Sequence, residues 1–155
     1  MTANKINRTA IGNIDLLQKR KIGFLASRQI ATLSVLPTLD WATAISQREE
    51  VAVVSGFHSQ MEREVLKILL RGKCGIIVVL ARGMYHQVPQ IYEEALQQNR
   101  LLLLSYEKDN LTRISERTAH KRNEWVVSLS DEMKLIALLR THPPLERIER
   151  DIFHP

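Results

Sequence analysis

The sequence predicts an α/β domain in which helices cover both faces of a mostly parallel β-sheet, giving three layers. Short, strongly apolar runs alternate with longer segments whose apolar residues recur at helical spacing, as in a series of β-α-β units. Two of the runs, KIGFLASR at residues 21–28 and VAVVSGFHS at residues 51–59, stop abruptly at small residues, as strands do where such sheets bind ligands. The 155 residues suffice for one hydrophobic core and are too few for two ordinary domains.

The individual elements follow from these patterns. Leu16 and Leu17, set among charged residues, predict a short helix or turn within residues 11–20. Apolar and β-branched runs then predict strands at residues 22–26, 51–54, 76–80 and 101–105. Apolar residues at helical spacing predict helices at residues 33–49, 59–71, 88–98 and 112–129. Gly72 ends the second of these helices, Pro89 begins the third, and residues 133–139 are the expected fifth strand.

The chain is expected to form one domain over residues 1–142 and a short tail at residues 143–155, because Pro143 and Pro144 interrupt any regular element. Its apolar runs are far shorter than the roughly 20 residues that cross a bilayer. The polar start lacks the apolar stretch of a secretion signal. These features predict a cytoplasmic protein without a membrane segment. The single Cys74 leads into an apolar run and is expected to be a buried, unreactive thiol.

Basic and small residues follow three of the expected strands. They are Ser27 and Arg28 after the first strand, Ser55 and Gly56 after the second, and Arg82 and Gly83 after the third. A guanidinium group there suits a phosphate, and glycine permits close backbone approach. The net charge of +5 and the pI of about 9.6 favour contact with polyanions. Solvated arginines and ordinary helix caps fit the same spacing, so both interpretations remain open.

A further basic cluster comprises His120, Lys121, Arg122 and Asn123. On its own this pattern is typical of a solvated helix face. The chain lacks the motifs GxSxG, HExxH, GxxxxGK[ST] and GxGxxG that mark common catalytic and nucleotide-binding sites. Glu62 and Glu64 occupy a first helical turn, where carboxylates more often interact with the helix dipole than catalyse a reaction. The sequence therefore predicts a binding protein, with no catalytic residue, cofactor or metal site.

Several segments match known motifs in collinear order. They are GNIDLLQKRKIGFLASR at residues 12–28, VVSGFHSQMEREVLKILLRG, IIVVLARGMY, LLLLSYE and KRNEWVVSLSD. These resemble, in turn, the GN…LL…VAIVGSR, SGLARGID, VLGTG, LLSE and RNRIIAGLSD segments of the DNA-processing protein A (DprA or Smf) family. The resemblance spans residues 12–139 and implies an extended Rossmann-like domain.

Members of that family bind single-stranded DNA and help load a RecA-type recombinase onto it during natural transformation. Carried over by position, the resemblance implies DNA-binding roles for Ser27, Arg28, Ser55, Gly56, Gly83, Arg122 and Asn123, with Lys121 beside them. Arg82 joins this set if its strand end faces the same crevice. Some positions depart from the pattern, since Ser59 and Gln60 replace the arginine and glycine of SGLARGID and Ala26 replaces the first glycine of GSR. Loss of positive charge is expected to weaken phosphate contact.

A second hypothesis is a protein that binds a nucleotide or its derivative in the same crevice. It would act as a sensor or as a relative of the LOG-type phosphoribohydrolases, which share the fold. The PGGxGTxxE signature of those enzymes is absent, which leaves the sensor as the stronger form of this alternative. With 5% aromatic residues the chain favours backbone contact over base recognition. Contact with a recombinase and assembly into a homo-oligomer are both left open by the sequence.

Overall fold

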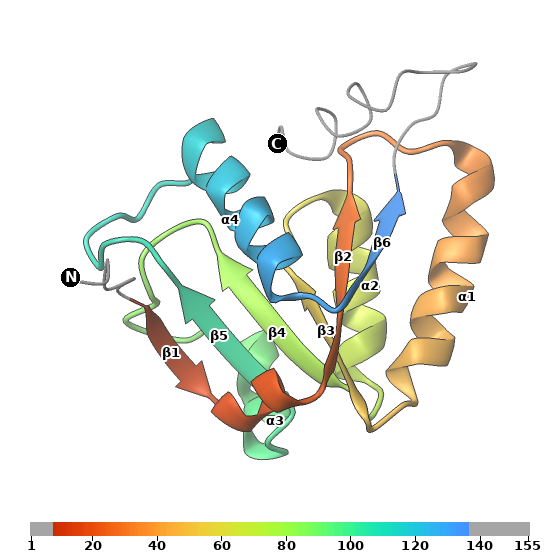
Figure 1. The fold of residues 1–155 in the computed structure, drawn as a ribbon, viewed down its shortest axis with the longest axis horizontal. Helices are drawn as coiled ribbons and strands as arrows, with labels where there is room; N and C mark the ends of the chain where they lie inside the picture. Colours follow the sequence, from red (N-terminus) through yellow and green to blue (C-terminus); the bar gives the residue numbers. More distant parts are fainter. Residues whose placement is uncertain (1–7, 137–155) are drawn as a thin grey trace.

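The computed structural model describes residues 8–136, which form a six-stranded sheet with the order β1-β5-β4-β3-β2-β6. Its strands are β1 (Thr9–Gly12), β2 (Arg20–Ala26), β3 (Val51–Ser55), β4 (Gly75–Leu80), β5 (Leu101–Ser105) and β6 (Glu132–Ile136). Strands β2 to β6 pair in parallel, and β1 pairs with β5 in the antiparallel direction. The expected α/β class with a mostly parallel sheet is confirmed (Figure 1).

Helices lie on both faces of the sheet. The α-helices are α1 (Val35–Ser46), α2 (Gln60–Leu70), α3 (Glu93–Gln97) and α4 (Glu116–Leu129), and the 3₁₀ turns are η1 (Ile14–Gln18), η2 (Thr32–Ser34) and η3 (Gln90–Tyr92). Helix α4 crosses in front of the sheet in the view of Figure 1, whereas α2 and α3 lie behind it. This three-layer arrangement buries two separate apolar clusters, one on each face.

The strands supply both clusters because successive side chains point to opposite faces. In β3, Val51 and Val53 pack with α1 and α2, whereas Ala52 and Val54 face the layer that contains α4 and η1. All residues of β3, β4 and β5 are buried. This two-sided burial explains why these strands are continuous apolar runs, which made them readable in the sequence.

Strand β1 was not predicted, because the sequence indicates a short helix or turn over residues 11–20. The 3₁₀ turn η1 forms within this range, at Ile14–Gln18. The residues before it, Thr9–Gly12, instead form a strand that pairs with β5 at the edge of the sheet. The strand is mostly exposed, so it lacks an apolar run. Gly12 has a φ of +112°, and a Cβ atom there would overlap the carbonyl oxygen of Leu101. The chain turns at this residue from β1 into η1.

Several expected boundaries were wrong. The helix expected at residues 88–98 is only η3 followed by the short α3, because the chain from Met84 to Pro89 forms an irregular connection. Helix α1 ends at Ser46, three residues before the expected end, and α4 begins at Glu116 after its N-cap Ser115. Strand β6 covers residues 132–136, and the remainder of the expected strand lies outside the described residues. The expected tail at residues 143–155 also lies outside them.

Cys74 is fully buried, and burial raises the pKa of its thiol to about 11. The thiolate is the reactive form, so the native protein should react with a disulfide reagent at a rate set by unfolding or local opening. A thiol titration with and without denaturant checks this. Rapid reaction of the folded protein would contradict the expected burial.

Within residues 8–136, no helix is both long and apolar enough to cross a membrane.

Candidate functional site

The candidate site lies where the parallel strands end. Because β2, β3, β4 and β5 run in the same direction, their carboxyl ends meet at one edge of the sheet. Ser27 and Arg28 follow β2, Gly56 follows β3, and Arg82 follows β4 within two residues. Strands β2 and β4 are separated by β3, so their ends lie about 10 Å apart at the backbone. We call this edge, with Lys121, Arg122 and Asn123 of α4, the strand-end site.

A buried glutamate occupies the corner between β2 and α2. Glu62 is 3% exposed, and its carboxylate accepts hydrogen bonds from three backbone N–H groups. Oε2 accepts from Ala26 at 3.0 Å. Oε1 accepts from His58 at 2.8 Å and from Ser59 at 3.2 Å. Ser59 in turn caps α2, since its hydroxyl accepts the N–H of Glu62 at 3.3 Å.

This geometry changes the interpretation of the corner. Backbone N–H groups at the start of a helix commonly hold a phosphate, and the strand ends suggested such a use here. In this protein the carboxylate of Glu62 already satisfies the N–H groups of Ala26, His58 and Ser59. The signal was present in the sequence, because Ser59 and Glu62 have the S-x-x-E spacing of a capping box. A phosphate at this corner must therefore rely chiefly on side chains.

Arg122 is buried beside the same corner. It is 5% exposed, and its side chain fills the space over Gly56, where a Cβ atom would overlap its Cδ and Nε atoms. Its Nε donates to Oδ1 of Asn123 at 3.1 Å. Burial lowers the pKa of Arg122, and the negative charge of Glu62 opposes that shift. Gly56 thus makes room for a buried cation that links α4 to the end of β3.

The turn after β3 has an unusual backbone. Phe57 has a φ of +48°, a left-handed conformation that residues other than glycine seldom adopt. Its N–H donates to the hydroxyl of Ser55 at 3.0 Å, and both side chains are buried. The hydroxyl of Ser55 therefore holds the turn in shape. This turn also directs the backbone N–H groups of His58 and Ser59 toward the carboxylate of Glu62.

The turns after β4 and β5 are joined to each other. Gly83 donates its N–H to the carbonyl of Leu111 at 2.7 Å, and a Cβ atom at Gly83 would overlap the carbonyl oxygen of Lys108. The hydroxyl of Ser105, the last residue of β5, donates to the carbonyl of Arg82. Gly83 is therefore needed for the close approach of two loops at this end of the sheet.

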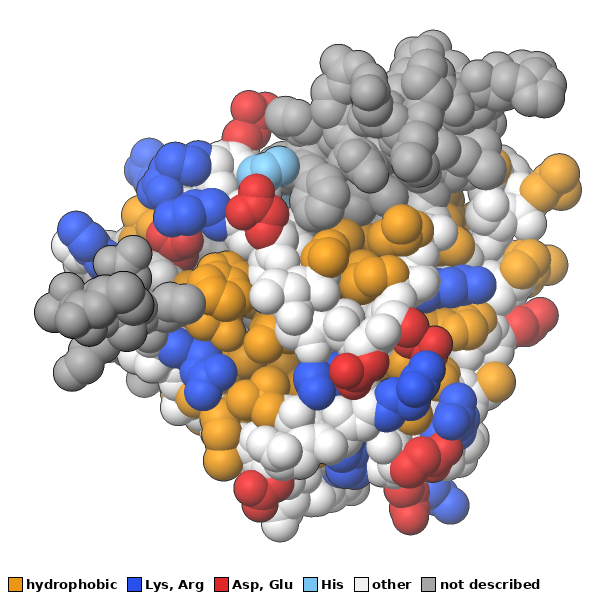
Figure 2. Space-filling view, in the orientation of Figure 1, with side chains coloured by type: hydrophobic (Ala, Val, Ile, Leu, Met, Phe, Trp, Pro, Cys, Tyr) orange, Lys and Arg blue, Asp and Glu red, His pale blue; other side chains and the backbone are white. Residues whose placement is uncertain are grey.

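Three of the sequence-predicted cations face outward. Arg28 and Lys121 are exposed, and Arg82 is partly exposed. The Nε of Arg82 donates to the carbonyl of Gly83 at 3.1 Å, and its guanidinium lies 4.7 Å from the ring centre of Tyr85. Figure 2 shows lysine and arginine side chains gathered over the amino-terminal part of α4, the helix that carries Lys121. These contacts orient Arg82 without neutralising its charge.

The nine predicted site residues thus divide into two groups. The outward-facing cations are Arg28, Arg82 and Lys121. The buried residues are Ser27, Ser55, Gly83, Arg122 and Asn123, with Gly56 beside them beneath Arg122. The hydroxyl of Ser27 donates to the carbonyl of Gln29, so it too shapes its own turn. The first group can reach a ligand in solvent, whereas the second group packs at the end of β3 and in the turns after β2, β3 and β4 or, for Arg122 and Asn123, on the buried side of α4.

His58 should titrate below the usual histidine range. Burial lowers its pKa, the positive charge of Arg122 lowers it further, and Glu62 partly opposes both effects. A histidine whose folded-state pKa is depressed takes up its proton more readily when unfolded, so stability decreases as pH falls through about 6.5. We expect NMR titration to place the pKa of His58 below 6.5, and the variant H58Q to show a shallower loss of stability on acidification. A pKa at or above 6.5 would contradict this.

Comparison with known proteins gives a consistent result. A sequence model of the family described as DNA recombination-mediator protein A matches residues 9–138. The structure resembles DNA processing protein A from Streptococcus pneumoniae, with a TM-score of 0.67 at 17% identity over 93% of this chain and 52% of that one. It also resembles the single-stranded DNA-binding DNA processing protein A from Helicobacter pylori, with a TM-score of 0.67 at 18% identity over 91% of this chain and 65% of that one.

These comparisons differ in what they establish. At 17% and 18% identity the structural matches show the shared fold, and this chain spans 52% and 65% of the lengths of those two proteins. The comparison with curated proteins gives no match. Among the described residues, no group of three or more His, Cys, Asp or Glu side chains is placed to hold a metal ion. The family match covers most of the sequence, so the chain belongs to the DNA recombination-mediator protein A family.

Proposed function

We propose that this chain binds single-stranded DNA along the strand-end site. Arg28, Arg82 and Lys121 would contact the phosphates. The observation that carries the proposal is the outward orientation of these three cations in a member of a recombination-mediator family. The similar Helicobacter pylori protein is described by its single-stranded DNA binding mode, which supports the same ligand class.

The occupied corner favours a polyanion over a single nucleotide. A mononucleotide site of the usual kind holds one phosphate on several backbone N–H groups at a helix start. Here Glu62 accepts from two such groups, those of His58 and Ser59, and from the N–H of Ala26 at the end of β2, and it places a negative charge among them. Separate cations, with Arg28 and Arg82 on turns after two strands and Lys121 on α4, instead suit several phosphates of one strand. Binding by side-chain cations releases counterions, so affinity should fall steeply with salt.

Membership of a DNA recombination-mediator family suggests a cellular role for this DNA binding. We propose that it contributes to DNA processing by holding single strands, and that transfer of the strand to a RecA-type recombinase follows. A direct contact with the recombinase is part of this proposal, and its test is co-binding of both proteins to one labelled oligonucleotide. The proposed role is binding and positioning of DNA, without a chemical step on it.

Fluorescence anisotropy of labelled oligo-dT across a salt series tests the DNA proposal. Three phosphate contacts predict a slope of about −2 in a plot of log affinity against log salt, or roughly a 20-fold loss between 50 and 200 mM. Affinity should also rise with oligonucleotide length. Equal competition by a thymidine mononucleotide would instead favour the nucleotide-binding alternative. No binding at low salt would reject the DNA proposal.

A further inference from the structure

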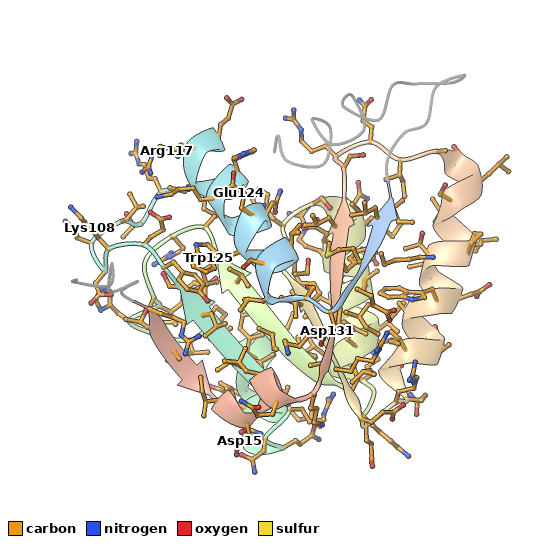
Figure 3. All side chains as sticks on the ribbon, in the orientation of Figure 1. Asp15, Lys108, Arg117, Glu124, Trp125 and Asp131 are labelled. Atoms are coloured by element: carbon orange, nitrogen blue, oxygen red, sulfur yellow. The ribbon has the colours of Figure 1, made fainter. Side chains whose placement is uncertain are left out.

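Two aromatic side chains stack beside the strand-end site. Tyr106 and Trp125 have ring centres 3.8 Å apart and ring planes within 4° of parallel. Both are partly exposed at the edge of the apolar cluster beneath α4. Figure 3 shows Trp125 on the side of α4 that faces β5. The other stacked pair, Phe24 and Trp41, is at 5.3 Å and 20° and packs in the cluster on the opposite face of the sheet.

Tyr106 and Trp125 each lie close along the chain to a residue of the strand-end site or its turns. Tyr106 directly follows Ser105, whose hydroxyl donates to the carbonyl of Arg82. Trp125 lies three residues after Arg122, which is about 4.5 Å further along the helix axis. A strand held at Arg82 and Lys121 therefore needs to extend only a short way to reach the rings.

Positive charge accompanies the rings along α4. Lys121 is four residues before Trp125 and so lies on the same side of the helix, and Arg117 is one turn earlier. Both are exposed. Glu124 directly precedes Trp125 in the sequence. Its carboxylate interacts with His120, whose Nε2 is 2.8 Å from Oε1 of Glu124. In Figure 2 the basic side chains over the start of α4 lie next to an apolar patch on the same face of the molecule.

We propose that the flank of α4 is a second DNA subsite, on which bases stack on the Tyr106–Trp125 pair while Lys121 and Arg117 contact phosphates. Nonspecific single-strand binding commonly combines a basic track with aromatic rings, because every base has a stacking face. The inference rests on the proposed function and extends it, since the strand-end site alone supplies cations but few rings. This proposal differs from the expectation that a chain with few aromatic residues contacts the DNA backbone and not the bases.

The two tryptophans of the chain allow a direct test. The variant W41F leaves Trp125 as the only reporter, and W125F leaves Trp41 on the other face of the sheet. We expect oligo-dT to quench the fluorescence of W41F in step with the anisotropy change, and to leave the fluorescence of W125F unchanged. An abasic oligonucleotide should bind more weakly and should not quench W41F.

Affinity measurements give the second arm. The variant W125L keeps an apolar side chain against the core, and we expect it to bind oligo-dT about 5- to 100-fold more weakly with an unchanged salt slope. Its affinity for the abasic strand should match that of the unmodified protein. If oligo-dT binds by anisotropy without quenching W41F, the second subsite is rejected and the strand-end proposal stands. If nothing binds, both proposals are rejected.

Discussion

Replacing Glu62 with alanine should lower the free energy of unfolding by about 3 to 5 kcal/mol. The substitution leaves the buried N–H of Ala26 and the partly buried N–H groups of His58 and Ser59 without their acceptor. It also removes the negative charge that offsets the buried Arg122. Uncompensated buried donors and charges are among the few causes of losses this large. Urea denaturation followed by circular dichroism measures the change.

Two further variants isolate the cause. Glu64 lies on the same helix, partly exposed, with Lys67 at 3.1 Å, so E64A should change stability by no more than about 0.5 kcal/mol. E62Q keeps one oxygen acceptor but turns an amide donor toward a backbone N–H, so its loss should fall between those of E64A and E62A. If E62A costs less than about 1 kcal/mol, the carboxylate does not organise this corner.

Loss of the carboxylate should also expose an anion site. In E62A the vacated N–H groups lie beside the start of α2, close enough to Arg122 for its charge to act on Glu62 and His58. Inorganic phosphate should therefore raise the Tm of E62A relative to chloride at matched ionic strength, because a ligand that binds only the folded state stabilises it. The unmodified protein should show no such difference. Equal behaviour of both proteins would mean that the corner is not a latent phosphate site.

Most strands of the sheet were predicted from the sequence, including the edge strand β6, whereas the other edge strand, β1, was not. Strands β3, β4 and β5 are buried on both faces, which forces the continuous apolar runs that identify them. Strand β1 lies at the edge and is mostly exposed, so its four residues carry no such pattern. Pairing with β5 defines it instead, and a contact between residues so distant in the chain leaves no local signal.

The roles of the site residues were harder to foresee. In the sequence Arg122 belongs to a polar run that is typical of a solvated helix, yet it is buried because α4 crosses back over the end of β3. Only the topology places it above Gly56. Glu62 shows the reverse case, since its capping-box spacing was visible but its contact with Ala26 depends on β2 lying beside α2. Local patterns identify the turns, and the packing of distant elements decides which side chains remain accessible.

Replacing both Arg28 and Arg82 with alanine should weaken binding of oligo-dT about tenfold at about 150 mM salt and make the salt slope shallower by about 1.4. Each arginine faces outward at a strand end, so each can neutralise one phosphate. Among the described residues neither side chain makes an ion pair, so the substitutions remove none. Thermal stability should therefore change little.

The matched control removes the same charge from the opposite edge of the sheet. Arg71 and Lys73 are exposed and lie between α2 and the beginning of β4, away from the strand carboxyl ends. The R71A/K73A variant lowers the net charge equally, so a general electrostatic attraction would weaken binding as much as R28A/R82A does. We expect instead less than about a twofold change and an unaltered slope. Equal losses in the two variants would place the DNA on no particular edge, and the outward cations at the strand ends would then be ordinary surface charges.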